Sequence, residues 1–284
     1  MRKSFSVGIT AIIVLLLLLL IFGLNTESGS LKQYKQTVGN SKYIRHALGG
    51  MDNNTYIDSI DALNYYYANG DKLYEVDVNF TSDDQLVLVH GWSESDYKER
   101  IGKEYNADNP IPTYNEFMSW KIQNKYTPTS FRDLVNFMKK HNDMYVMLDF
   151  GNRSYEDTLK AYKAVVAAAE NNDSILNRFI VGGHTTDMIK AVKEVYDFKI
   201  INLYLQKEKK REEQLKNLDD YINYCKNNQI TSFSVSVANY TPEVAEKMKD
   251  SGLISYVFTT DDISEADSIM SMGANIIGTN FLIK

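Results

Sequence analysis

Residues 144–171 read MYVMLDFGNRSYEDTLKAYKAVVAAAEN, and this stretch indicates the fold. An apolar run at residues 144–149 ends in Asp149, and a helical pattern follows at residues 155–171. A short apolar run bounded by polar residues is typical of a strand buried in a parallel sheet. One such strand followed closely by a helix is the repeating unit of an α/β fold.

The same alternation extends outward from this unit over residues 43–284. This length fits a single (β/α)8 TIM barrel. An open doubly wound sheet is the main alternative, but no Gly-rich G-x-G-x-x-G loop follows the first apolar run. Strands are expected at residues 43–48, 73–78, 86–90, 144–149, 179–182, 199–205, 231–237, 254–259 and 274–279, with helices between most of them.

The run at residues 86–90 makes one strand more than the eight of a TIM barrel. Residues 79–84, which connect it to the preceding run, are too few for a helical crossover. We therefore expect either a hairpin arm or a barrel strand reached without a helix. Residues 91–129 then form an excursion over one face of the barrel.

The N-terminal segment is predicted to be a membrane anchor. Arg2 and Lys3 precede an apolar run at residues 7–24, and ~20 apolar residues span a bilayer core. A cleavable signal peptide is the alternative, but the run is long and lacks a small-x-small cleavage site. The predicted organisation is a cytoplasmic tip and transmembrane helix at residues 1–25, a linker at residues 26–42 and the barrel at residues 43–284. The basic tip favours a single-pass cell-membrane protein with its barrel outside the cytoplasm.

The charge and cysteine content argue against a nucleic-acid-binding protein and against a disulfide-stabilised one. The formal net charge is -6, and Lys and Arg are scattered, so we expect no nucleic-acid partner. The single cysteine, Cys225, allows no internal disulfide.

Polar residues within or at the ends of the early strands form the candidate site. Glu75 and Asp77 are two residues apart, so their side chains lie on the same side of a strand. Two carboxylates buried together need a positive partner, and a divalent cation with Asp149 as third ligand is the simplest one. Taken one at a time, these residues also have structural explanations. A histidine at a strand end, such as His46 or His90, can be a hydrogen-bonded structural residue, and Asp149 can cap the next helix. The combination at the catalytic end of a barrel favours an active site, made of His46, Glu75, Asp77, His90 and Asp149.

At these residues the sequence resembles the glycerophosphodiester phosphodiesterases, within the phospholipase-C-like phosphodiesterase barrels. The family has a strand ending His-Arg-Gly, a Glu-Asn-Thr helix start, Glu-x-Asp-Val, a Thr-x-Asp-Gly turn, a strand ending His-Asp and a later Glu-x-Lys. The corresponding segments here are Ile44-Arg-His-Ala-Leu-Gly49, Asn53-Asn-Thr55, Glu75-Val-Asp-Val78, Thr81-Ser-Asp-Asp84, Leu88-Val-His-Gly91 and Asp149-Phe-Gly151. The C-terminal elements Trp-Thr-x-Asn and Gly-Ile-x-Thr-Asp are similar to Phe258-Thr-Thr-Asp261 and Ile276-Ile-Gly-Thr-Asn280.

The resemblance implies a metal-dependent barrel enzyme that cleaves a phosphodiester. Glu75, Asp77 and Asp149 would hold one divalent ion, Ca²⁺ or Mg²⁺. His46 and His90 would be the general acid and base, in an order that stays open.

Three departures from the family pattern bear on the substrate. Ala47 and Gly151 stand where the family has Arg and Lys, so phosphate binding must rely on the metal or on other groups. The family's His-Asp pair is replaced by His90-Gly91, which is closer to the His-Gly of the phosphatidylinositol phospholipase C branch. The expected partner is a phosphodiester of a small molecule, a lipid headgroup or a surface polymer outside the membrane. The alternatives are a phosphatidylinositol-type phospholipase C and a catalytically silent barrel that binds a phosphorylated glycan or a protein.

Overall fold

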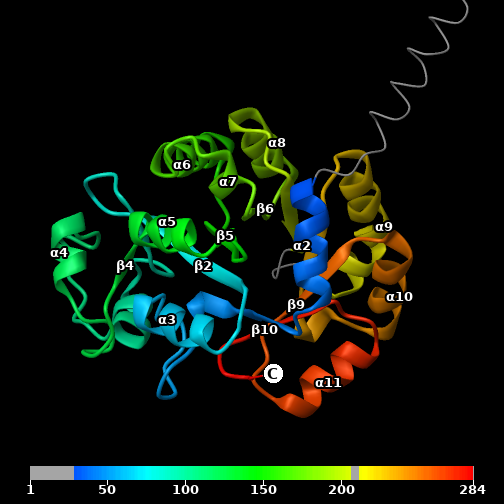
Figure 1. Cartoon of the computed structure of the whole chain (residues 1–284), viewed down its shortest axis with the longest axis horizontal. Helices are drawn as coiled ribbons and strands as arrows, with labels where there is room; N and C mark the ends of the chain where they lie inside the picture. The colour runs from blue at the N-terminus through cyan, green and yellow to red at the C-terminus, as the bar shows by residue number, and fades with distance from the viewer. Residues whose placement is uncertain (1–28, 206–210, 284) are drawn as a thin grey trace, which may run out of the picture.

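Eight parallel strands form a closed barrel in the computed structural model, which describes residues 29–205 and 211–283 (Figure 1). Each strand pairs in parallel with the next, and β1 closes the ring by pairing with both β10 and β2. The predicted α/β barrel is therefore confirmed. Its strands are β1 Tyr43–Arg45, β2 Leu73–Phe80, β5 Tyr145–Asp149, β6 Phe179–Gly183, β7 Ile200–Tyr204, β8 Ser232–Ser236, β9 Ile254–Phe258 and β10 Ile276–Thr279.

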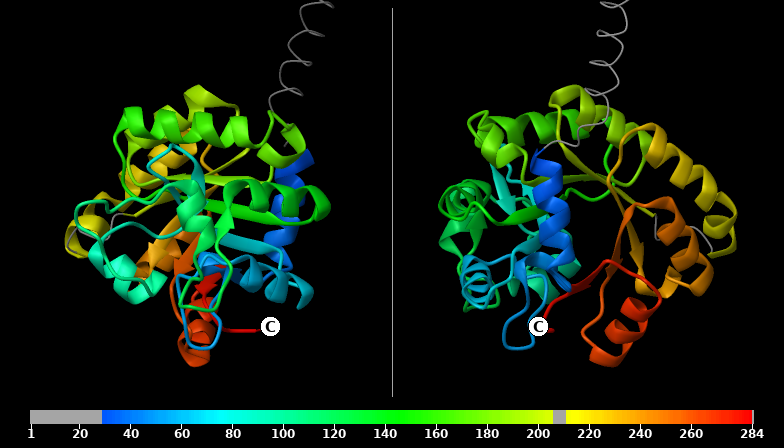
Figure 2. Two further views of the ribbon diagram at one scale, coloured as in Figure 1. Left: turned by 90° about the vertical axis from the view of Figure 1, so that its left-hand side faces the viewer. Right: turned by 45° about the vertical axis from the view of Figure 1, so that its right-hand side comes forward.

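Helices cover the outside of the barrel (Figure 2). Their starts follow ordinary capping chemistry: Ser130 and Asp133 form a capping box, and Thr241 caps the helix that begins at Pro242. The covering helices are α3 Ile60–Ala68, α5 Phe131–Lys140, α6 Tyr155–Ala168, α7 Asp173–Leu176, α8 Thr186–Val195, α9 Arg211–Asn227, α10 Pro242–Ser251 and α11 Ile263–Ser271.

One further helix, α2 Gly29–Gly39, packs against the barrel interior. Tyr34 and Val38 are four residues apart, so they lie on one helix face, and both are buried. They pack with residues at the strand starts such as Leu73 and Tyr145, and the Tyr34 hydroxyl hydrogen-bonds to that of Tyr256. Residues 29–39 are therefore a packed helix rather than part of the linker expected for residues 26–42.

The extra strand is a hairpin arm. β3 Leu86–Leu88 pairs antiparallel with the end of β2, and the two-residue β4 Thr129–Ser130 pairs antiparallel with β3. One of the two alternatives for residues 86–90 is thus correct, whereas β4 was not expected. Because β2 is longer than the other barrel strands, its end remains available for this pairing.

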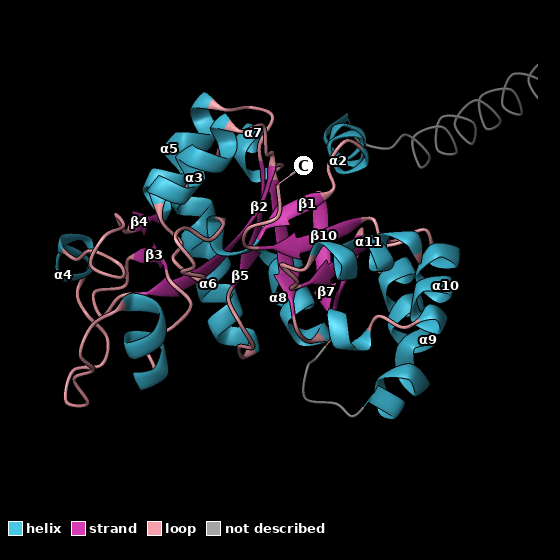
Figure 3. Ribbon diagram, turned by 90° about the horizontal axis from the view of Figure 1, so that it is seen from below, coloured by secondary structure: helices cyan, strands magenta, loops and turns pink. Residues whose placement is uncertain are grey.

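Residues 91–129 form a folded insertion beside this arm, on the side of the barrel away from α9 and α10 (Figure 3). It contains a π-helical turn, η2 Asp96–Ile101, and the short helix α4 Tyr114–Ser119. Aromatic edges and faces meet within it, among Trp92, Tyr97, Phe117 and Trp120. These side chains join the main hydrophobic core of the barrel, and this packing fixes η2 in place.

The first covering helix begins later than expected. Ser59 accepts a hydrogen bond from the backbone N–H of Ala62, so α3 starts at Ile60 rather than near Thr55. The residues before it include left-handed backbone at Tyr56 and Asp58, which ends any helical pattern there. Asn53-Asn-Thr55, the segment matched to the family's helix start, therefore lies before the helix and does not begin it.

Within residues 29–205 and 211–283, no helix is both long enough and apolar enough to cross a membrane. The anchor expected at residues 7–24 lies outside the described residues.

Candidate active site

The five predicted residues line one cavity of about 360 Å³, at the carboxyl ends of the barrel strands. His184, Tyr204 and Phe258 complete part of its wall. The carboxyl end is where barrel enzymes place their chemistry, because strand-end side chains and loops from several units converge there.

Three carboxylates converge in the cavity. Asp77 on β2 pairs in register with Asp149 on β5, and Glu75 precedes Asp77 by two residues on the same strand. One oxygen from each of the three lies within 4.8 Å of the others. Two oxygens bound to the same Ca²⁺, each ~2.3–2.6 Å from it, are at most about 5 Å apart. The spacing therefore fits a shared divalent cation.

A buried carboxylate oxygen without a hydrogen-bond partner also supports a shared divalent cation. Asp77 Oδ2 is buried and has no hydrogen-bond partner in the part of the chain that the structure describes. Burial raises the pKa of the Asp77 carboxyl well above its usual range, and the charges of Glu75 and Asp149 raise it further. A cation bound here would offset these costs, and the oxygen donors suit a hard metal ion.

Asp149 is held differently from Asp77. Its Oδ1 accepts a hydrogen bond from the Gly151 backbone N–H at 2.6 Å and lies 3.2 Å from His184 Nε2. Burial raises the pKa of Asp149, but the His184 contact and the Gly151 N–H outweigh it, and the pKa lies below its usual range. Asp149 therefore brings a negative charge to the cluster without needing a metal.

His46 follows β1 in a 3₁₀ turn, and its Nδ1 lies 3.0 Å from Asn280 Oδ1. The Asn280 amide nitrogen donates to Asp261, which also accepts from two backbone N–H groups and the Thr279 hydroxyl. Burial raises the pKa of Asp261, but these hydrogen bonds outweigh it and the pKa lies below its usual range, so Asp261 only accepts. The amide oxygen of Asn280 must then face His46. His46 therefore carries its proton on Nδ1 and has Nε2 as an acceptor.

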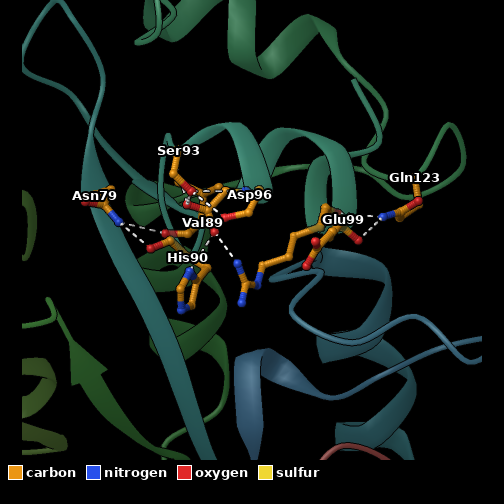
Figure 4. Close-up of polar contacts among 9 residues, drawn as sticks. Asn79, Val89, His90, Ser93, Asp96, Glu99 and Gln123 are labelled. Carbon is orange, nitrogen blue, oxygen red and sulfur yellow. Dashed lines mark hydrogen bonds and ion pairs between the residues drawn. The ribbon is translucent and has the colours of Figure 1, made fainter. Parts of the chain in front are cut away.

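His90 follows β3, and its Nδ1 lies 2.8 Å from Asp96 Oδ1 (Figure 4). Asp96 also accepts hydrogen bonds from the hydroxyl and the backbone N–H of Ser93. Burial raises the pKa of Asp96, but the bonds from Ser93 and His90 outweigh it, so the pKa lies below its usual range. An ionised carboxylate thus orients the His90 ring.

The Tyr56 ring contacts both histidines. Its centroid is 4.5 Å from that of His46 and 5.0 Å from that of His90, and both contacts are edge-to-face. The two imidazoles are therefore joined through one aromatic ring in the wall of the cavity.

The structure also reveals residues that sequence reasoning missed. Asp96 lies in an insertion without a periodic pattern, and Asn280 was recognised only as part of a motif. The buried Asp58 accepts a hydrogen bond from the Asp77 backbone N–H at 3.3 Å. Burial, followed by the charge of Asp77, raises the pKa of Asp58 well above its usual range. His184 directly follows β6, and its place after an apolar strand is the signal that could have identified it.

Two oriented histidines beside a carboxylate cluster, on a parallel barrel, define a site for acid–base hydrolysis. The sequence model of the Glycerophosphoryl diester phosphodiesterase family matches residues 49–284. The chain therefore belongs to this family, whose members are phosphoric diester hydrolases.

Solved structures share the fold at low identity. A glycerophosphoryl diester phosphodiesterase structure from Silicibacter pomeroyi is 13% identical with a TM-score of 0.66, over 84% of this chain and 90% of that one. A glycerophosphodiester phosphodiesterase from Parabacteroides distasonis is 17% identical with a TM-score of 0.64, over 84% and 92%. An Oleispira antarctica phosphodiesterase, solved with the product sn-glycerol-3-phosphate, is 12% identical with a TM-score of 0.65, over 84% and 93%. No curated protein sequence matches the chain.

The buried charge of Asp77 gives a pH-dependent prediction for the metal-free protein. Because the folded-state pKa is raised, the carboxyl is more costly to bury as the pH rises from the unfolded pKa through the folded one. Asp77→Asn should therefore stabilise the metal-free chain relative to wild type by on the order of 1–3 kcal/mol at pH 8, and by less near pH 4. Urea unfolding with chelator at both pH values measures this difference.

Added Mg²⁺ or Ca²⁺ should make wild type more stable than Asp77→Asn, because an ion that binds only the folded wild type stabilises it. Asp250→Asn, at an exposed position, is the matched control and should show neither effect. The shared-cation interpretation would be contradicted if neither ion changed the stability of wild type and if wild type and Asp77→Asn were equally stable at every pH.

Proposed function

We propose that this protein hydrolyses a phosphodiester with the help of one divalent cation. The observation that carries the proposal is the pair of differently supported histidines beside three converging carboxylates. Glu75, Asp77 and Asp149 would hold the ion, and oxygen ligands suit Ca²⁺ or Mg²⁺. When bound, the ion supplies positive charge that stabilises the phosphate oxygens in the transition state.

The hydrogen-bond partners assign different roles to the two histidines. His46 contacts a neutral amide through Nδ1, and in the neutral imidazole its Nε2 would accept the proton of the attacking oxygen. His90 contacts a carboxylate through Nδ1, and its Nε2–H would protonate the departing alkoxide. We infer that His46 is the general base and His90 the general acid.

The substrate class rests on the family and on the position of the site. The family acts on glycerophosphodiesters, and the Oleispira antarctica relative is described with sn-glycerol-3-phosphate as product. We propose a glycerophosphodiester-like headgroup or surface polymer as the substrate. The cavity lies at the open end of the barrel, which leaves room for a group larger than glycerol on one side of the phosphate.

Removing either histidine should reduce phosphodiester hydrolysis by ~10²–10⁴-fold, the usual contribution of a general acid or base. The leaving group separates the roles. For a p-nitrophenyl ester, whose leaving group needs no proton, His90→Ala should keep much more activity than it keeps for an alkyl ester. His46→Ala should lose activity toward both.

Steady-state rates of the two variants on both esters measure this, with His141→Ala as control because His141 caps α5 and does not line the cavity. If His90→Ala lost the same fraction of its activity toward both esters, His90 would not be the general acid.

The phospholipase C alternative was suggested by His90-Gly91, and the structure gives Gly91 another explanation. A Cβ at Gly91 would lie 2.5 Å from Asp96 Oδ2, so a side chain there is incompatible with the carboxylate that supports His90. The glycine therefore makes room for Asp96. A carboxylate beside His90 is retained in space, although it comes from a different residue.

Hydrolysis by water should give an open phosphomonoester as the first product. We expect phosphorus NMR of the reaction with a glycerophosphodiester to show no cyclic phosphate signal at early times. A phosphatidylinositol-type phospholipase C would instead release a cyclic phosphate first. A silent barrel would bind the ester without turnover, which calorimetry together with the NMR time course would reveal.

We further propose that residues 1–25 anchor the protein in the cell membrane with the barrel outside the cytoplasm. The support is the uncharged run at residues 7–24 behind Arg2 and Lys3. The full-length chain should remain in the membrane fraction after alkaline carbonate washing, and protease added to intact cells stripped of their outer layers should digest the barrel. Release by carbonate, or complete protection from protease, would overturn this topology.

A further inference from the structure

We propose that Arg100, from the insertion, binds the phosphate of the substrate in place of the cations that are absent at positions 47 and 151. The inference rests on the proposed phosphodiester chemistry and assigns to Arg100 a role that the family motifs do not contain. A phosphodiester carries a negative charge, and a planar guanidinium is well matched to its oxygens.

The position of Arg100 is the first argument. Its guanidinium carbon lies 4.6 Å from the centroid of Tyr56, the ring that contacts both His46 and His90. Arg100 Nη1 also contacts Asp96, the carboxylate that holds His90. The side chain therefore packs directly behind the Tyr56 wall of the cavity, one residue away from each histidine.

The charges around the site are complementary to a phosphate. Glu75, Asp77 and Asp149 would hold the proposed cation, and the Arg100 guanidinium lies against Tyr56 in the wall of the same cavity. A phosphate lying between the cluster and Arg100 would meet positive charge from both sides.

The guanidinium also keeps donors for a ligand. Its ion pair with Asp96 uses Nη1, whereas an arginine has five N–H donors. Asp96 is shared with His90 and Ser93, so its charge is divided among several donors. About a quarter of the Arg100 side chain, 23%, is exposed to solvent, so a ligand can reach part of it.

The neighbouring arginines are engaged elsewhere. Arg153 donates from Nε to the Phe150 carbonyl and from Nη2 to the Asn79 amide oxygen. Arg45 is fully buried and paired with Asp71. Of these three described arginines, Arg100 is the one placed beside the histidines.

The backbone around Arg100 is fixed before any ligand arrives. Gln123 donates from its amide nitrogen to the carbonyls of Glu99 and Arg100, at 2.8 and 3.0 Å. Asn79 donates likewise to the carbonyls of Val89 and His90, as Figure 4 shows. Both the segment that carries His90 and the turn that carries Arg100 are thus tied down, which lowers the entropic cost of binding an anion.

Binding of inorganic phosphate to the full-length protein in detergent with Mg²⁺, measured by calorimetry, tests the proposal without requiring turnover. Arg100→Ala should weaken phosphate binding by ~10-fold or more, the loss expected for charge-assisted hydrogen bonds. Arg100→Lys, which keeps the charge but not the fork, should fall between Arg100→Ala and wild type. Lys98→Ala removes an exposed cation from the same turn and should bind phosphate as wild type does.

Kinetics separate phosphate binding from a merely structural role. On a phosphodiester that wild type hydrolyses, Arg100→Ala should raise KM by a factor similar to the loss in phosphate affinity, with a smaller change in kcat. A fall in kcat with unchanged KM and unchanged phosphate affinity would show that Arg100 only supports Asp96, and would overturn the proposal. So would equal phosphate affinities for Arg100→Ala and Lys98→Ala.

Two other outcomes are also decisive. If Arg100→Ala does not fold, Arg100→Lys decides the question, since it retains the ion pair with Asp96; wild-type phosphate affinity and KM in that variant would contradict recognition by the guanidinium fork. If wild type hydrolyses no phosphodiester but binds phosphate through Arg100, the proposed hydrolysis fails while the anion site stands.

Discussion

Repulsion among the carboxylates Glu75, Asp77 and Asp149, of which the first two are buried, is the constraint on which the site depends. One oxygen of each lies within 4.8 Å of the others, where like charges raise each other's pKa unless something positive offsets them. The buried Asp58 behind Asp77 increases the cost instead of relieving it. The cluster therefore has the character of a cation site, and the proposed divalent ion would offset this repulsion.

The lost family cations are connected to the same constraint. At position 47 the family has Arg, and here the Ala47 backbone N–H donates to Glu75 at 2.8 Å. At position 151 the family has Lys, and here the Gly151 N–H donates to Asp149 from a residue with φ of 67°. Both positions thus orient metal-cluster carboxylates through the backbone. The side-chain charge at these two places has gone, and Arg100 enters from a different segment of the chain.

The parts of the molecule that were predictable are those fixed by local patterns. Strand-end positions identified the barrel and brought Glu75, Asp77 and Asp149 together, because parallel strands end at the same face. The support of His46 by Asn280 was not predictable, since these residues are 234 positions apart. Asp96 lies in a π-helical turn without periodicity, and α2 buries only Tyr34 and Val38 among polar neighbours. Tertiary contacts, rather than local sequence, determine these elements.

The unequal support of the two histidines suits an in-line displacement. Attacking and leaving oxygens lie on opposite sides of a phosphorus during phosphoryl transfer, so one group must take a proton while another gives one. His46 and His90 both contact the Tyr56 ring, with centroids 4.5 and 5.0 Å away, and all three residues line the cavity. An uncharged amide lies behind His46 and an ionised carboxylate behind His90, so the two rings are unequal before substrate arrives. In the proposed reaction the nucleophile would pass its proton to His46, and His90 would give a proton to the leaving group.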